Sequence, residues 1–373
     1  MTDSWQEVPP PSTSPSRPGR SRARRIAKVV SGVALVLLIA AVAIGISYHP
    51  GWVETVPGEA QPIAAHVHVD GARSFPPRSS VNLVYVRERD NLNYWEYLFA
   101  KYVHDHAELS PEPPPSPITP DQMAACDMRD SQATAKAVAL RRLGYNMTTL
   151  PGMQVVAIYR LDAPVAKVLQ CGDVIEAIDG TPTPNHDRLT HAIGSHHIGD
   201  SVLVRYVRDG KVRSDPVRLV GDEGVPRLGI EATEPVRYPV KLTIDTGNIG
   251  GPSAGLAMTL TLLDTLTPGE LTGGKRVVAT GTIEPDGSVG EIGAVELKAV
   301  AVSQSRADLF LIPKCQEDPK RDPAGLADCR STNDQARRNA KGVKVVEVGS
   351  LDDALAALRA AGGAPLVVPP THS

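Results

Sequence analysis

Hydrophobic and polar positions follow different patterns along the chain, and one apolar region stands apart. From Val29 to Tyr48 the sequence runs for 20 positions without a charged residue. A helix that crosses a bilayer needs about 20 apolar residues, so we predict a transmembrane helix over 29–48. A cleaved signal peptide is the alternative, with Ala41-Val42-Ala43 as a weak cleavage site, although the run is longer than a usual signal core.

Charge flanks this apolar run unequally. Residues 1–28 hold six basic and two acidic side chains and are rich in Pro and Ser, which predicts a disordered basic tail. The first charges after the run are acidic. The positive-inside rule therefore places the tail in the cytoplasm and the rest of the chain outside it, at the cell membrane. The net charge beyond residue 28 is −7, which argues against nucleic acid as a partner.

The stretch 49–143 mixes strand and helix patterns. Apolar residues cluster or alternate over 63–69 and 81–86, which predicts strands, and 132–143 has the spacing of a helix. Between them, 111–120 is rich in proline and is predicted as a flexible loop.

A different pattern begins near Gly144 and continues to about residue 222. Asp209-Gly210 between two alternating segments is a strong hairpin signal. The predicted elements are, in order, a strand at 153–158, a short helix at 163–169, a strand within 172–180 with turn signals at each end, a helix at 185–195, and hairpin strands at 202–206 and 212–219.

A lone serine stands among glycines where a third pattern begins. The sequence from Asn248 to Gly255 leads into an apolar run that predicts a buried helix. Pro252 suits the first turn of a helix, and Gly250 and Gly251 permit a tight approach before it. Ser253 would then lie beside free backbone N–H groups, which can stabilise an oxyanion. An ordinary serine cap on a helix is the alternative.

A lone lysine interrupts a second apolar helix pattern, 293–302. The residues three and four positions from Lys298 on either side are all apolar, so Lys298 is expected on the core-facing stripe. Burial lowers the pKa of a lysine, and a neutral amine can take a proton from a serine hydroxyl. A lysine whose stem merely covers apolar surface is the alternative.

Together these segments resemble the proteolytic domain of Lon-type Ser/Lys proteases, from Pro226 to about Leu358. Three motifs match in order, at 251–255, 280–290 and 292–298. The resemblance implies that Ser253 is the nucleophile and Lys298 the general base. It gives supporting positions to Gly251 and Ala254 around the serine, and to Thr280, expected to hydrogen-bond near the lysine.

Two departures from that family are visible. Ala294 stands where the family usually has glycine, and because alanine is a good helix former we expect it to be tolerated. No phosphate-binding Gly-x4-Gly-Lys-Ser/Thr motif occurs, since Gly274-Lys275 is followed by Arg276. We therefore expect no ATP and no other cofactor.

The middle stretch resembles a PDZ domain through Ala163-Pro164, Gly172–Ile175 and Asp179-Gly180. PDZ domains bind C-terminal peptides by strand addition; a spacer without a ligand is the alternative. Its carboxylate-binding loop is expected near 150–153, where Pro151 departs from the common pattern. Nearly the whole chain then resembles the membrane-anchored, PDZ-containing Lon-like proteases of bacteria.

The fold class expected is α+β, with the PDZ domain inserted in or preceding a Lon-type domain. The expected divisions are a tail at 1–28, a transmembrane helix at 29–48, an α+β segment packing with the protease at 49–143, a PDZ domain at 144–222 and the proteolytic domain at 223–373.

Cysteine and histidine leave further alternatives open. Cys315 and Cys329 flank a polar loop and could pair, which would leave Cys126 and Cys171 as a second pair; four free thiols are equally compatible with the sequence. Paired histidines at 66 and 68, 104 and 106, and 196 and 197 lack the spacing of zinc proteases, so no metal is expected. Asp245 either lines the site or caps a turn.

The function expected is an ATP-independent serine endopeptidase acting on exported or membrane-associated proteins, with homo-oligomers as one arrangement of the family. The first alternative is a catalytically inactive, membrane-anchored PDZ adaptor. The second is a Ser/Lys hydrolase of another acyl-transfer class.

Overall fold

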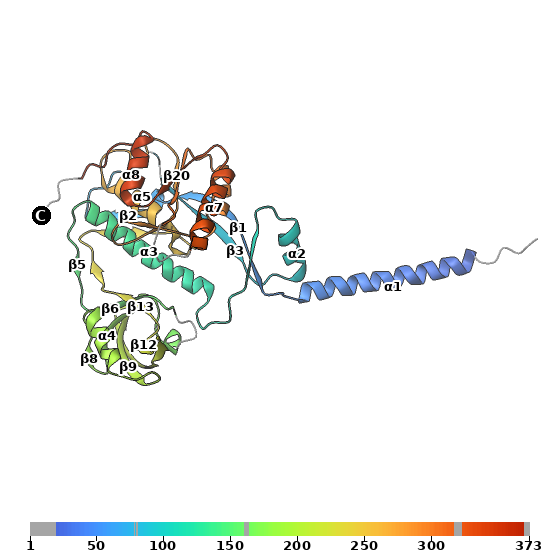
Figure 1. Cartoon of the computed structure of the whole chain (residues 1–373), viewed down its shortest axis with the longest axis horizontal. Helices are drawn as coiled ribbons and strands as arrows, with labels where there is room; N and C mark the ends of the chain where they lie inside the picture. The colour runs from blue at the N-terminus through green and yellow to red at the C-terminus, as the bar shows by residue number, and fades with distance from the viewer. Residues whose placement is uncertain (1–19, 78, 80, 160–163, 317–322, 369–373) are drawn as a thin grey trace, which may run out of the picture.

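The computed structural model describes residues 20–77, 79, 81–159, 164–316 and 323–368. A long helix, α1 (Arg20–Ser47), projects from a body in which two sheets form separate parts (Figure 1). We call these parts the main domain and the middle domain.

Helix α1 starts earlier than the sequence pattern predicts. Residues 20–28 are helical, so the prediction of a disordered tail over 1–28 is wrong for them, and residues 1–19 lie outside the described chain. The segment Arg24–Ser47 is long and apolar enough to cross a membrane, with a mean hydropathy of 2.9. A signal sequence near the N-terminus passes the same test of length and composition, so this helix is either a span or a signal.

The main domain is built on a six-stranded sheet in the order β20-β19-β16-β3-β1-β4. Its strands β3, β16, β19 and β20 pair in parallel, whereas β1 runs antiparallel to both β3 and β4. The bounds are β1 (Trp52–Pro62), β3 (Val81–Arg89), β4 (Glu108–Pro111), β16 (Val277–Ala279), β19 (Leu309–Pro313) and β20 (Lys344–Val348).

Helices cover both faces of this sheet because its strands are apolar on both sides. Leu83, Val277 and Leu311 pack toward α3, α5 and α8, and Val84, Val278 and Phe310 pack toward α6 and α7. Parallel strands buried on both faces read as continuous apolar runs. The helices are α3 (Pro120–Arg142), α5 (Gly255–Leu266), α6 (Val295–Gln304), α7 (Pro323–Asn339) and α8 (Leu351–Ala360).

Four segments before the middle domain differ from the sequence expectation. The strand β1 was not predicted, and 63–69 divides into a 3-10 turn, η1 (Ala64–His66), and a strand, β2 (Val67–Asp70). Helix α3 begins at Pro120, twelve residues earlier than expected, because Thr119 and Gln122 form a capping box there. A short helix, α2 (Tyr94–Tyr102), was also missed.

The middle domain has a sheet in the order β10-β9-β7-β6-β13, with β8 beside β7. The predicted hairpin is confirmed, with Asp209 and Gly210 both at positive φ in its turn. The elements are β6 (Met153–Ala157), η2 (Pro164–Lys167), β7 (Val174–Ile178), β8 (Thr181–Pro182), α4 (His186–Gly194), β9 (Ser201–Arg208), β10 (Lys211–Arg218), β11 (Val220–Asp222), β12 (Val225–Arg227) and β13 (Glu231–Thr233).

The middle domain is inserted into the main domain. The main sheet takes β1 and β3 from before it and β16, β19 and β20 from after it. The chain enters through β5 (Thr148–Thr149) and leaves through β14 (Val236–Arg237), and these two strands pair with each other. Because β13 belongs to the middle sheet, this unit extends past residue 222.

Candidate active site

The serine lies on a turn that joins a strand to a buried helix. β15 (Lys241–Ile244) pairs with β2, and the chain then turns through Gly251, whose φ is 88°, into η3 (Pro252–Ala254) and α5. Only glycine adopts that backbone conformation at low cost. Ser253 is half-buried at the start of this helical segment, as the sequence indicates, while Ala254 is buried beneath it.

Four hydrogen bonds from distant segments hold this turn. The N–H of Gly251 donates to the carbonyl of Ala124 at 2.8 Å, and the Ser131 hydroxyl donates to the carbonyl of Pro252 at 3.0 Å. The Ser253 carbonyl accepts from the N–H of Gly281 at 2.9 Å. It also accepts from the Thr280 hydroxyl, at 3.2 Å. Ala124 and Ser131 belong to α3, so that helix fixes the serine turn from behind.

Lys298 lies one turn inside α6 and reaches the serine. Its side-chain nitrogen is 3.0 Å from the Ser253 hydroxyl oxygen. The residue is only 4% exposed, packed on the helix face that carries Val295 and Val302. Burial lowers the pKa of Lys298 to about 8, against an opposing effect of the Glu296 carboxylate. An amine with that pKa is partly neutral near pH 7 and can accept a proton.

Ala294 corrects one expectation about the lysine helix. The residue is not inside the helix but caps it, at φ 56° and ψ 36°, in the left-handed region. Glycine occupies this region without steric cost, whereas alanine does not. The reason given for tolerating alanine, its helix propensity, was therefore wrong.

Thr280 lies on the serine side of the site rather than on the lysine side. It is fully buried, and its hydroxyl donates to the backbone of Ser253. The predicted hairpin follows it, with β17 (Thr282–Ile283) paired to β18 (Val289–Gly290). Thr280 therefore holds the backbone of Ser253.

A groove runs up to the serine turn. Its volume is about 630 Å³, and its wall continues to Gly250, next to the turn. Asp245 both lines this groove and caps a turn by accepting from the N–H of Gly247 at 2.9 Å. A larger cavity, about 1260 Å³, touches neither Ser253 nor Lys298, so we assign it no part in the chemistry.

Comparison with protein families agrees with this arrangement. The family model of the PDZ domain matches residues 141–219, and that of the Lon protease (S16) C-terminal proteolytic domain matches residues 227–325. The chain carries a PDZ domain followed by a Lon-type serine protease domain. The second match contains both Ser253 and Lys298. The middle domain is thus the PDZ domain, and the main domain contains the protease.

Solved structures resemble the PDZ domain. The PDZ domain of an SdrC-like protein from Listeria monocytogenes is 30% identical over 23% of this chain and 90% of its own, with a TM-score of 0.22. Its counterpart from Listeria innocua is 29% identical over 22% of this chain and 92% of its own, with a TM-score of 0.21. Comparison with curated proteins finds no match.

The PDZ sheet has a free edge at β13 rather than at β6. The expected carboxylate-binding loop at 150–153 precedes β6, but β6 is paired on both sides, with β7 and β13. The outermost strand on that side, among the described residues, is β13. It follows Gly229, whose φ of 86° allows a sharp turn before the strand. Strand addition at this side of the sheet would therefore use β13.

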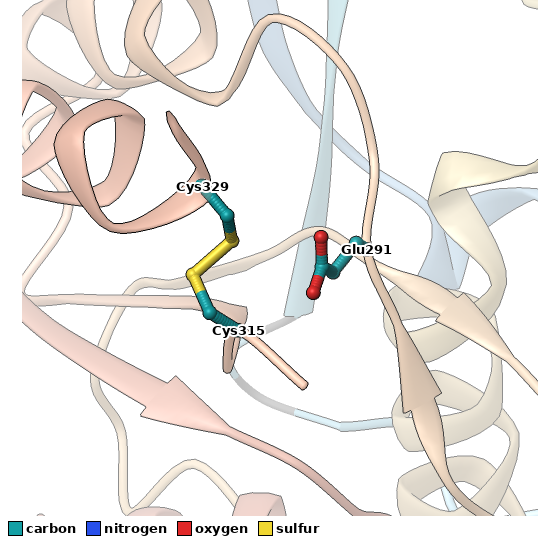
Figure 2. Close-up of side chains that lie close together, drawn as sticks. All are labelled: Glu291, Cys315 and Cys329. Atoms are coloured by element: carbon teal, nitrogen blue, oxygen red, sulfur yellow. A yellow bond between two sulfur atoms is a disulfide. The ribbon is translucent and has the colours of Figure 1, made fainter. Parts of the chain in front are cut away.

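Both cysteine pairs are disulfides. Cys126–Cys171 joins α3 to the PDZ domain, and Cys315–Cys329 closes a loop of the protease domain. Glu291 lies beside the second disulfide, and its carboxylate and the two sulfurs lie within 4.8 Å of one another (Figure 2). Because both sulfurs are oxidised, neither is available as a thiolate metal ligand.

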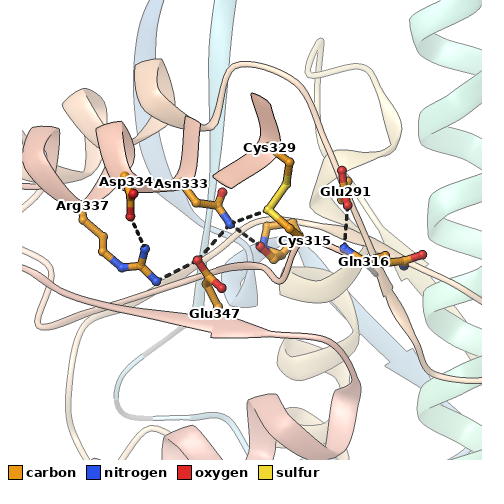
Figure 3. Close-up of a disulfide and its surroundings, with 9 residues drawn as sticks. Glu291, Cys315, Gln316, Cys329, Asn333, Asp334, Arg337 and Glu347 are labelled. Carbon is orange, nitrogen blue, oxygen red and sulfur yellow. Dashed lines mark hydrogen bonds and ion pairs between the residues drawn. A yellow bond between two sulfur atoms is a disulfide. The ribbon is translucent and has the colours of Figure 1, made fainter. Parts of the chain in front are cut away.

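The second disulfide lies next to the segment that leads into the lysine helix. Gln316, next to Cys315, donates its N–H to the Glu291 carboxylate at 2.8 Å (Figure 3). Asn333 of α7 donates to the carbonyl of Pro313 at 3.0 Å and to Glu347 at 3.1 Å. Residue 291 is three positions before the left-handed cap Ala294, so the contact between Gln316 and Glu291 lies close to the start of α6.

His104 and His196, from two of the histidine pairs, have acidic partners. His104 lies 2.7 Å from Glu54, and His196 lies 3.2 Å from Asp179.

The main residues of the serine turn's hydrogen bonds that sequence reasoning missed are Ala124, Ser131 and Gly281. No short motif could reveal the first two, because Ser131 is 121 positions from its partner Pro252.

Proposed function

We propose that this protein is a membrane-anchored endopeptidase in which Ser253 and Lys298 form the catalytic dyad. The observation that carries the proposal is the 3.0 Å contact between the lysine nitrogen and the serine oxygen, together with the burial of that lysine. Hydroxyl and amine within hydrogen-bond reach are what an activated serine nucleophile requires.

The proposed reaction uses both residues in turn. Neutral Lys298 accepts the Ser253 proton as the oxygen attacks the peptide carbonyl, and the lysine then protonates the leaving amine. Water next attacks the acyl-enzyme and gives a proton to Lys298. As the ester bond breaks, Lys298 returns this proton to the Ser253 oxygen, which frees the carboxylic acid product and restores the dyad. First-turn N–H groups beside Ser253 point away from the helix and would hold the oxyanion.

The groove beside the serine turn is the proposed path of the substrate chain. It is open, and it is formed by β3 on one side and by 245–250 on the other. The chain itself has no phosphate-binding loop, since Lys275 is followed by Arg276. We therefore propose cleavage without ATP hydrolysis by this chain, and on segments that are already unfolded or extended.

The proposed location is the cell membrane, with the N-terminus in the cytoplasm. Helix α1 has the length and composition of a span, and basic residues lie before it. Two disulfides in one chain are in keeping with an oxidising compartment for the body. The substrates proposed are accordingly exported or membrane-associated proteins.

The PDZ domain is proposed to bind extended peptides at β13. That strand leads through β14 and β15 into the serine turn, only twenty positions separating Thr233 from Ser253. A peptide added there would lie on the segment that carries the nucleophile, which suits substrate delivery or gating.

Labelling with a fluorophosphonate tests the dyad. The full chain should label, Ser253→Ala should not, and Lys298→Ala should label at least about 100-fold more slowly. Ser303→Ala and Lys344→Ala are matched controls, one on the lysine helix and one exposed on β20, and should label normally. Absence of labelling in the folded wild type would favour the inactive PDZ adaptor. Turnover of esters but not of a peptide library would indicate another acyl-transfer enzyme.

A further inference from the structure

Helix α2 concentrates the aromatic residues of the chain. The sequence contains three Trp, nine Tyr and three Phe. Five of these fifteen lie within the nine residues of α2: Tyr94, Trp95, Tyr97, Phe99 and Tyr102. So dense a cluster in a short surface helix calls for a physical reason.

The helix divides its aromatic residues between two faces. Tyr97 and Ala100 face the body, where the Tyr97 ring lies 5.7 Å from that of Trp52 and Ala100 is buried. On the opposite face Trp95, Phe99 and Tyr102 follow a spacing of four and three, which aligns them on one stripe. They are 42%, 52% and 72% exposed, and Val103 next to them is 62% exposed.

This exposed face adjoins the body-proximal end of α1. The N–H of Tyr94 donates to the carbonyl of Tyr48 at 2.9 Å, and the Trp95 indole donates to the carbonyl of Val42 at 3.2 Å. Gly45 is buried under that indole, and a methyl group there would overlap it. The two helices therefore meet at a defined contact, next to each other in Figure 1.

The contact fixes the depth of the aromatic stripe relative to α1. Val42 lies five residues before the end of α1 at Ser47, which at a helical rise of 1.5 Å is about 8 Å along its axis. Helices that lie in a membrane interface bury their apolar face about 5–10 Å into the headgroup and acyl boundary. Trp and Tyr are the residues enriched at that level.

We propose that α2 is an interfacial helix whose Trp95, Phe99 and Tyr102 face inserts into the outer surface of the bilayer that α1 crosses. This inference rests on the proposed membrane anchoring. The occupant is lipid, because the stripe is continuous with the proposed span. One acidic and one basic residue, Glu96 and Lys101, leave the helix without net charge, so zwitterionic lipid suffices. The protease domain would then be held close to the membrane surface.

Tryptophan quenching by brominated phosphatidylcholine in vesicles tests the insertion. With Trp5→Phe and Trp52→Phe, the reconstituted full chain reports Trp95 alone, and we expect about twofold or greater quenching, strongest with bromine near the headgroup. The matched control, Trp5→Phe with Trp95→Phe, reports Trp52 on the opposite face of α2 and should be quenched much less. The proposal would be overturned if brominated lipid quenched Trp95 and Trp52 equally. It would also be overturned if iodide quenched Trp95 to the same extent in vesicles as in detergent.

Two further measurements separate this inference from the proposed function. Alkaline carbonate extraction reports whether α1 anchors the chain in the membrane. If the chain stays in the membrane and Trp95 is not quenched, only the α2 proposal is refuted. If the chain is released from the membrane, the proposed membrane anchoring is refuted as well. Phe99→Asp with Tyr102→Asp should at least halve Trp95 quenching and leave fluorophosphonate labelling of Ser253 unchanged. Cross-linking of α2 to a second copy, with Trp95 shielded from both lipid and iodide, would assign the stripe to a protein interface instead.

Discussion

The serine and lysine halves of the candidate site are held by different forces. Ser253 is positioned by hydrogen bonds to its turn from α3 and from Thr280 and Gly281. Lys298 is positioned by burial of its helix among apolar side chains, and the same burial lowers its pKa. The hydrogen bonds therefore mainly set the geometry of Ser253, whereas burial mainly sets the basicity of Lys298. Substitutions that disturb each half separately should change different observables.

Replacing the lysine should give the largest effect. Lys298→Met keeps most of the side-chain volume but removes the base, so kcat/KM should fall at least about 1000-fold. The same substitution should increase the stability of the folded protein. Because the folded pKa of about 8 lies below the unfolded value, a protonated Lys298 costs about 3 kcal/mol at pH 7.

The sign of that stability effect can be checked by pH. The destabilisation of the folded protein by protonated Lys298 is complete below pH 8. It decreases as the pH rises from about 8 to 10.5, and it is absent above pH 10.5. Chemical denaturation at pH 7 should therefore show Lys298→Met more stable than wild type by about 1–3 kcal/mol. Lys344→Met, on an exposed strand position, should change neither quantity. A destabilised Lys298→Met would contradict a burial-lowered pKa.

The pH profile should give the next largest effect. With the Lys298 pKa at about 8, kcat/KM should rise about tenfold per pH unit and level off above 8, for roughly a hundredfold between pH 6 and 9. Glu296→Gln removes a charge that raises this pKa, so the profile should move to lower pH. A profile in Glu296→Gln that moves to higher pH would show that the carboxylate acts in another way.

A smaller effect is expected on the serine side. Thr280→Val removes the hydroxyl that bonds the Ser253 carbonyl, while Gly281 still donates to it. One such hydrogen bond contributes about 1 kcal/mol, which is about fivefold in kcat, with KM and the pH midpoint unchanged. Thr280→Ser should recover most of the rate. A shifted pH midpoint would place Thr280 on the lysine side after all.

The smallest effect should come from the cap of the lysine helix. Ala294→Gly relieves a left-handed alanine but loosens the unfolded chain, so the net gain is about 0.5 kcal/mol, or 1–2 °C in Tm. Ala301→Gly, inside the same helix, should instead destabilise by about 1 kcal/mol or more. Calorimetry measures both, and equal losses would mean that the cap is not strained.

Sequence patterns were sufficient where the information is local. The PDZ hairpin at Asp209-Gly210, the apolar environment of Lys298 and the glycine turn before Ser253 all lie within a few residues of the feature they determine. β1 was missed because Pro57 and Gly58 interrupt its alternation at a bulge. The conformation of Ala294 depends on how the chain enters the helix, which residue propensity does not report.

Other features depend on contacts between distant segments. The hydrogen bonds from α3 to the serine turn join residues more than 120 positions apart. The free edge of the PDZ sheet could not be predicted from the loop at 150–153, because it depends on which later strand joins β6. Such pairings follow from topology, and a single sequence gives little information on them.

The insertion of the PDZ domain has a consequence for the order in which the molecule can assemble. Val81 of β3 pairs in parallel with Val277 of β16, on the far side of the PDZ domain. A chain synthesised from its N-terminus therefore completes the PDZ fold while β3 is paired with β1 but still lacks its second neighbour, β16. Such long-range pairings close slowly. The free edge of β3 is therefore exposed to non-native association until about two hundred further residues have been synthesised.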